Sequence, residues 1–203
     1  MRRRISELKK LYQGKRQMIE QRLKEFSQVL PDHYFYEGIF CLLTPQTSGR
    51  RSWQAVLALQ NAGFLHADID PKPFLKGIRF HHTKAARLKE FKQIFPCVYA
   101  ELVSQKSAAQ KATFLEENVN GMGPKEANHF LRNIGYRNRA ILDRHILRNL
   151  QYYGCLRSVP KSLTRKQYSA IEKTFREFSE RIGIPLDHLD LLFWSNETGE
   201  ILK

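Results

Sequence analysis

The stretch "NGMGPKEANHFLRNIGYRNRAILDRHILRN" (residues 120–149) decides the fold, because it joins two helical patterns through a very short turn. Gly121, Met122 and Gly123 stand between the end of one pattern and the start of the next. The glycines allow a tight turn and the close approach of another backbone. Pro124 then occupies the first helical position, where proline costs no hydrogen bond because the first helical N–H groups lack intrahelical partners. The stretch predicts two helices joined by a glycine hairpin.

Helical periodicity continues on both sides of this hairpin, and alternating strand patterns are nearly absent. An amphipathic helix is expected within residues 5–30, and an apolar helix before the turn at Pro45, Ser48 and Gly49 is followed by another from about Arg51. Further helical patterns cover residues 72–78, 83–104, 107–117, 124–134, 144–153, 164–182 and 187–194. Short loops between these patterns predict an all-α protein.

Composition points to a polyanionic partner. The 203 residues can form one large domain or two small interlocked ones, and 42% hydrophobic residues can fill a core. The formal net charge of +14, from 34 Lys and Arg against 20 Asp and Glu, exceeds what solubility requires. Nucleic acid is the first candidate partner, and an acidic membrane surface is the second.

Cysteine usage and the N-terminus indicate a reduced intracellular protein. Cys41, Cys97 and Cys155 stand singly, without the spacing of a zinc site, and are expected to be core thiols. No run approaches the roughly 20 apolar residues of a membrane span. The basic start, residues 1–5, has no apolar segment behind it and is not a secretory signal. We expect the cytoplasm of a prokaryote, in association with the nucleoid.

The hairpin and the helix behind it form a candidate anion site. Backbone N–H groups gather at a helix start, and the positive end of the helix dipole favours a phosphate there. Lys125 lies in the same first turn, where the dipole disfavours a positive side chain and Asp, Glu or Ser would be usual. A plain turn between helices is the alternative interpretation. A lysine in this position, if it is also desolvated in a cleft, is suited to attack an electrophilic carbon and form a Schiff base.

Asp143 is the second candidate for chemistry. It stands where an N-cap residue should precede the helical pattern "RHILRNLQYY", and Ile141 and Leu142 before it look core-facing. A simple cap is one interpretation. The other is a fixed carboxylate that opposes the positive charge of an oxocarbenium-like glycosidic transition state.

The glycine hairpin, the lysine behind it and the aspartate eighteen residues later match a known pattern. The sequence resembles the helix-hairpin-helix DNA glycosylases, and among them the archaeal-type second class of 8-oxoguanine DNA glycosylase/AP lyase. The resemblance is dense in "GMGPKEANHFLRNIGYRNRAILDRHILRNL", and it recurs at "FCLLTPQTS", "GIRFHHTKA" and "LDLLFWSNETGEILK". It covers most of the chain in order.

The resemblance implies a role for each candidate residue. Lys125 would attack C1′ of the damaged nucleotide, and Asp143 would stabilise the sugar cation. The residues that would hold the DNA backbone near the lesion are Asn120, Gly121, Met122 and Gly123. A monovalent cation on the hairpin carbonyls is compatible with this. The target nucleotide must be flipped out of the duplex, so the implied partner is double-stranded DNA containing 8-oxoguanine.

Recognition of the base is implied mainly at the end of the chain. The class ends in a lysine that helps to recognise the oxidised base, which corresponds to Lys203, and Trp194 would stack on the flipped purine. For Phe80, core packing is the favoured interpretation, and the resemblance offers a pocket aromatic as the alternative. Gln46 corresponds to a position that fills the hole left by the flipped nucleotide. The four-cysteine iron–sulfur loop of endonuclease III relatives has no counterpart, and we expect no cluster, metal or other cofactor.

We therefore expect a two-lobed all-α protein, a monomer without membrane contact. Residues 39–137 would form a central bundle that ends in the hairpin, and residues 1–38 with 138–203 the second lobe. The cleft between them would hold Lys125 and Asp143. The expected activity is excision of 8-oxoguanine followed by β-elimination. A glycosylase of the same fold for another oxidised base, and a noncatalytic structure-selective DNA-binding module, are the alternatives.

Overall fold

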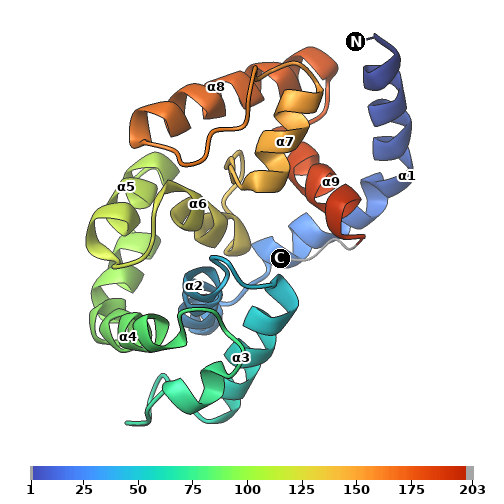
Figure 1. The fold of residues 1–203 in the computed structure, drawn as a ribbon. Coiled ribbons are helices and arrows are strands. Elements are labelled where there is room, and N and C mark those ends of the chain that lie inside the picture. Colours follow the sequence, from blue (N-terminus) through green and yellow to red (C-terminus); the bar gives the residue numbers. More distant parts are fainter. Residues whose placement is uncertain (1, 200–203) are drawn as a thin grey trace. The chain divides into compact units, whose positions relative to one another are not determined.

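The computed structural model of this protein describes residues 2–199, and its long elements in that range are helices (Figure 1). The α-helices are α1 (Arg2–Ser27), α2 (Tyr34–Leu43), α3 (Gly49–Asn61), α4 (His81–Val103), α5 (Ala108–Asn118), α6 (Pro124–Asn133), α7 (Arg144–Tyr152), α8 (Arg165–Ile182) and α9 (Leu186–Thr198). Two 3₁₀ turns are η1 (Pro31–His33) and η2 (Lys72–Leu75). The prediction of an all-α protein is confirmed. None of the helices in the described range is long and apolar enough to cross a membrane.

The chain divides into two compact units. Unit 1 contains the described residues of Met1–Gln28 and Gly135–Lys203, and unit 2 is Val29–Ile134. The N- and C-terminal segments thus pack with one another, while the middle of the chain forms a body of its own. The boundaries in the structure lie earlier in the sequence than the expected ones, after residues 28 and 134 instead of 38 and 137.

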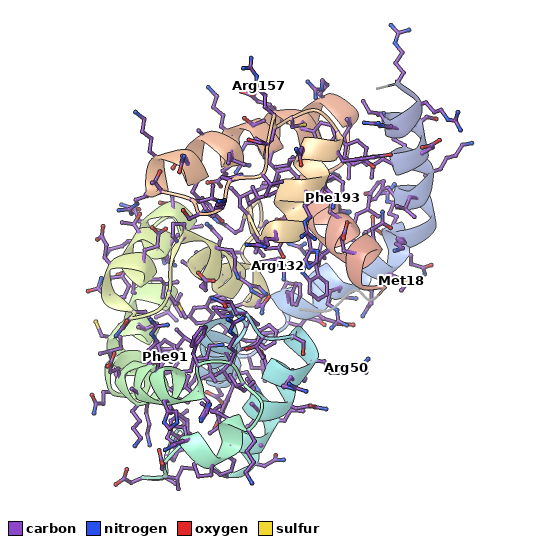
Figure 2. The ribbon with its side chains drawn as sticks, in the orientation of Figure 1. Met18, Arg50, Phe91, Arg132, Arg157 and Phe193 are labelled. Carbon is purple, nitrogen blue, oxygen red and sulfur yellow. The ribbon has the colours of Figure 1, made fainter. Side chains whose placement is uncertain are left out.

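Unit 2 is organised around α2, which packs against α3, α4 and α6. Nine of its ten residues are buried, so protein surrounds the helix on every face. Its one glycine, Gly38, makes room for two aromatic rings: a Cβ there would lie 2.4 Å from Phe91 Cζ and 3.3 Å from Phe130 Cζ. Phe91 points from α4 into this core (Figure 2). The close packing of α2 and α6 fixes the start of α6, which carries the candidate lysine.

Unit 1 is organised around α9, which packs against α1, α7 and α8. Phe193 lies at the centre of its core (Figure 2), stacked on Tyr153 with ring centroids 5.5 Å apart and on Phe175 at 6.1 Å. The amphipathic pattern of the first helix supplies one wall of this core, with Leu8, Tyr12, Ile19, Leu23 and Phe26 buried. The helix expected before residue 30 is confirmed.

The cysteines are free thiols in different surroundings. Cys41 is buried in α2 and Cys155 is half-buried, but Cys97 is exposed on α4. The expectation of three core thiols is therefore wrong for Cys97, because the face of α4 that carries it is turned to solvent. Among the described residues, no group of three or more His, Cys, Asp or Glu side chains is arranged to hold a metal ion.

Candidate functional site

The hairpin between α5 and α6 is anchored by its apolar residues. Val119 and Met122 are both buried, and the Met122 N–H donates to the Val119 carbonyl at 3.0 Å. Gly121 adopts φ +92°, and a Cβ there would lie 2.7 Å from Arg87 Cδ. Glycine is required at this position both by the left-handed backbone and by the arginine side chain packed on it.

The second glycine of the hairpin is not required by its backbone conformation. Gly123 is the N-cap of α6 in an extended conformation that any residue can adopt, and its N–H donates to Glu126 Oε2 at 3.2 Å. The amide groups of Met122 and Gly123 are thus engaged within the protein. The backbone donors that remain for an anion are those of the first turn of α6, because a helix leaves its first N–H groups without intrahelical partners.

Lys125 projects from this first turn and forms an ion pair with its neighbour. Its Nζ lies 3.0 Å from Glu126 Oε1, and the exposed fractions of the two side chains are 27% and 14%. Glu126 therefore uses one carboxylate oxygen for the hairpin and the other for the lysine. The pair was not foreseen from the sequence, although a Glu three residues after an N-cap is a known capping signal.

Buried polar groups lie on the inner side of α6. Asn133 donates to Glu37 Oε2 at 3.1 Å and accepts from Arg132 at 3.4 Å. Next to them, burial raises the pKa of the Cys41 thiol well above its usual value, and the Glu37 carboxylate raises it further. The thiol stays protonated at neutral pH, so Cys41 is a packing residue and no nucleophile.

Two loops of unit 2 expose the other candidate residues. Gln46 follows α2 at φ +56°, and Phe80 precedes α4 at φ +57°. Phe80 is 54% exposed, so the expectation that it packs in the core is wrong. A left-handed backbone at residue 80 turns the ring outward, and nothing in the sequence signals that conformation.

Asp143 is the N-cap of α7, as predicted. Its Oδ1 accepts the Ile146 N–H at 2.8 Å, and its backbone is extended at φ −85°. Ile141 and Leu142 before it are buried, which confirms that they face the core. The N-cap bond engages one carboxylate oxygen and fixes the direction of the other.

The loop before Asp143 is held by two buried carboxylates of α9, which we call the aspartate network. Asp187 accepts the N–H groups of Asn138 at 2.8 Å and Arg139 at 3.2 Å, and Asp190 accepts the Ile141 N–H at 3.4 Å. Both aspartates are almost fully buried. Sequence reasoning missed this network. The available signal was the pair of aspartates three residues apart among the leucines of α9.

Tyr168 of α8 completes the support of the same loop. Its hydroxyl donates to the Ala140 carbonyl at 2.6 Å and accepts the Leu142 N–H at 3.3 Å. With the aspartate network, the backbone of the loop is held from two helices of unit 1. Asp143 is therefore presented from a rigid segment, although its sequence reads as a loop.

Trp194 lies on α9 near the same end of unit 1. Its ring meets the His145 imidazole edge-on with centroids 6.3 Å apart, and His145 Nδ1 lies 3.6 Å from Glu197 Oε2. The indole is half-buried. Lys203, the other residue expected to recognise the base, lies outside the described residues.

Comparison with known proteins gives consistent matches along the chain. A family model described as 8-oxoguanine DNA glycosylase matches residues 19–184. The 8-oxoguanine DNA glycosylase/AP lyase of Fusobacterium nucleatum is 35% identical, over 98% of this chain and 97% of that protein. The protein of the same name from Korarchaeum cryptofilum is 38% identical, over 93% and 91%.

A solved structure matches the fold as closely. It is the 8-oxoguanine glycosylase/lyase of Methanocaldococcus jannaschii in complex with a 15mer DNA containing 8-oxoguanine. The two chains superpose with a TM-score of 0.83 at 32% identity, covering 97% of this chain and 99% of the other.

Proposed function

Because this chain belongs to the 8-oxoguanine DNA glycosylase family, we propose that it excises 8-oxoguanine from duplex DNA and then cleaves the strand at the resulting site. The observation that carries the proposal is its likeness, over nearly its whole length, to proteins named for both activities. The net charge of +14 supports a DNA substrate, since a basic protein attracts the phosphate backbone.

The proposal makes Lys125 the nucleophile. Its unprotonated Nζ attacks C1′, the bond from C1′ to the base breaks, and the base leaves with that electron pair and gains a proton. In the resulting N,O-acetal Nζ loses a proton, and the bond from C1′ to O4′ breaks as O4′ gains a proton, which leaves an imine between C1′ and Nζ. Loss of a C2′ proton then expels the 3′ phosphate by β-elimination. Glu126, 3.0 Å from Nζ, holds the side chain beside the hairpin until the substrate arrives.

Asp143 acts in this proposal through its charge. A carboxylate opposes the positive charge that develops on the sugar as the glycosidic bond breaks. The bond from the Ile146 N–H to Oδ1 supports this role, because it restricts the rotation of the carboxylate. A rigid anion needs no reorganisation in the transition state.

The remaining assignments concern the damaged base and the surroundings of the enzyme. We assign base recognition to Trp194, Phe80 and Lys203, the space left in the duplex to Gln46, and the DNA backbone to the hairpin from Asn120 to Gly123. The protein would work as a monomer in the prokaryotic cytoplasm, at the nucleoid, without a resident metal. A monovalent cation on the hairpin carbonyls is compatible with this chemistry.

Borohydride trapping tests the proposed function. Reduction of the imine should give a covalent complex with duplex DNA that contains 8-oxoguanine, and none with undamaged duplex. Lys125→Gln should abolish the complex, while Lys76→Gln, at an exposed lysine of the same unit, should leave it unchanged. Trapping that persists in Lys125→Gln would refute the nucleophile. Release of oxidised pyrimidines in preference to 8-oxoguanine would refute the proposed lesion.

A further inference from the structure

Unit 2 holds two residues in an unusual backbone conformation on neighbouring loops. Gln46 and Phe80 both have positive φ, at +56° and +57°, although neither is glycine. Residues with a side chain enter this region at a cost, and they remain there only where the surrounding structure fixes them. Phe80 is also mostly exposed, so its conformation serves no packing of the core.

A single hydroxyl connects the two loops. Thr47, which follows Gln46, accepts the N–H of Arg79 at 3.3 Å and a hydrogen bond from Lys84 Nζ at 3.2 Å, both through Oγ1. Arg79 immediately precedes Phe80. This hydrogen bond between Arg79 and Thr47 therefore joins the chain neighbours of the two residues with positive φ.

Lys84 is the centre of this connection. Besides Thr47, its Nζ donates to the carbonyls of Leu43 and Pro45, each at 2.7 Å, so all three ammonium protons are used. Its own N–H donates to the Phe80 carbonyl at 2.9 Å. We call this set of bonds the Lys84 network. It ties the end of α2, the turn with Gln46 and the start of α4 to one side chain.

The buried ammonium is costly to keep. Lys84 is 2% exposed, and desolvation, helped by the nearby cations of Arg87 and Lys125, lowers its pKa from 10.5 to about 8. An apolar side chain of similar length would fill the space without this penalty, and replacing buried charges by apolar groups is often tolerated or stabilising. What an apolar side chain could not do is hold three acceptors from separate segments in fixed places.

We propose that Lys84 is a positioning residue that holds Gln46 and Phe80 as one preformed edge, with Gln46 set to enter the space left in the duplex and Phe80 set to stack on the extruded base. The proposal rests on the proposed function and deepens it. An exposed aromatic face can stack on any base, and an amide can donate and accept where a base has left its partner. Fixing both before binding avoids the entropy cost of ordering them on the DNA.

Replacement of Lys84 should therefore slow the extrusion of the base more than the lyase step. A preformed abasic site has no base to extrude, so its cleavage needs Lys125 but depends little on this edge. Lys84→Met should slow 8-oxoguanine release from duplex by on the order of 100-fold, the effect of a small misplacement of positioning groups. Cleavage of a preformed abasic site should change by no more than about threefold, by the same reasoning.

Lys111 provides a matched control. It is 3% exposed, and its Nζ donates to the carbonyls of Leu102 at 2.6 Å and Ser104 at 2.8 Å, at the end of α4. It binds helix-end carbonyls as Lys84 does, but it adjoins neither Gln46 nor Phe80. Lys111→Met should change stability in a similar way to Lys84→Met, but it should leave the ratio of base release to abasic-site cleavage at the wild-type value.

Single-turnover rates of 8-oxoguanine release and of abasic-site cleavage, measured for wild type, Lys84→Met and Lys111→Met, test the role of Lys84. Equal ratios in the two variants would overturn the role of Lys84. If Lys84→Met does not fold, Thr47→Val removes the link between the loops, keeps the bonds to Leu43 and Pro45, and should lower the ratio in the same direction; an unchanged ratio there would also overturn it. Failure of wild type to release 8-oxoguanine would instead refute the proposed function.

A fluorescence measurement separates positioning from stability. In a Lys125→Gln background, which blocks the chemistry, 2-aminopurine beside the lesion should brighten when the protein unstacks the duplex. Adding Lys84→Met should remove most of this increase at saturating protein, and adding Lys111→Met should not. An undiminished increase with Lys84→Met would contradict the proposed role.

Discussion

The Lys84 network of unit 2 and the aspartate network of unit 1 fix their loops with buried charges of opposite sign. Lys84 donates to carbonyls at the end of α2, whereas Asp187 accepts N–H groups from the loop that leads to α7. Helices leave carbonyls unpaired at their ends and N–H groups unpaired at their starts. In unit 2 the buried cation holds carbonyls at and just after a helix end, and in unit 1 the buried anion holds N–H groups of the loop ahead of Asp143.

The two networks also differ in what they present. In unit 1, Asn138 has φ +57°, a conformation that asparagine tolerates. The residue that the aspartate network presents is Asp143, the N-cap of α7. In unit 2 the strained residues Gln46 and Phe80 are themselves presented. One network positions a carboxylate through its backbone, and the other positions two side chains for contact.

The largest effect is expected from removing the charge that unit 1 presents. Asp143→Asn keeps the N-cap, because asparagine caps as well as aspartate, but it removes the anion opposed to the sugar cation. Base release should fall by on the order of 100- to 1,000-fold, as for the loss of one group that stabilises transition-state charge. Single-turnover excision and a thermal melt measure the two effects. Near-normal excision, or loss of folding, would contradict the separation of cap and charge.

Breaking the aspartate network should give a smaller loss that combines stability and activity. Asp187→Ala removes the acceptor of the Asn138 and Arg139 N–H groups, at about 0.5–1.5 kcal/mol for each lost hydrogen bond. Base release should fall as well, because Asp143 is then presented from a looser segment. Urea unfolding and excision rates check this, with Asp68→Ala at an exposed position of unit 2 as the control. Unchanged excision despite reduced stability would show that the network has no part in presenting Asp143.

The smallest effect concerns pH and the buried cation of unit 2. The pKa of Lys84 is lowered from 10.5 to about 8 by desolvation, so between these values the unfolded chain binds a proton that the folded chain has released. The unfolding free energy therefore rises with pH in this window. The unfolding free energy of wild type minus that of Lys84→Met should be larger at pH 9.5 than at pH 7.5. A difference that stays constant or falls would mean that the ammonium is not desolvated.

How far each network could be predicted depends on the sequence distance of its bonds. The cap of Asp143 and the bond between Glu126 and Gly123 each span three residues, and such patterns are visible in the sequence. The bond from Lys84 to Leu43 spans 41 residues and that from Asn138 to Asp187 spans 49. These bonds depend on which helices pack together. Local periodicity predicts the helices but not their partners.

The exposure of single residues is likewise not predicted by the local sequence. Core packing is the ordinary expectation for an aromatic side chain such as that of Phe80, but the left-handed backbone there turns the ring outward. Resemblance to a family indicated the pocket role of Phe80 and the chemistry of Lys125. It did not indicate Lys84, Asp187 or Asp190, which support the candidate residues from behind.

The identity of the nucleophile is tested most directly by locating the covalent bond. Wild-type protein is trapped with borohydride on duplex DNA containing 8-oxoguanine, the complex is digested with protease and nuclease, and the modified peptide is sequenced by mass spectrometry. The sugar remnant is expected on Nζ of Lys125. A remnant on Lys84 or on the N-terminal amine would contradict it.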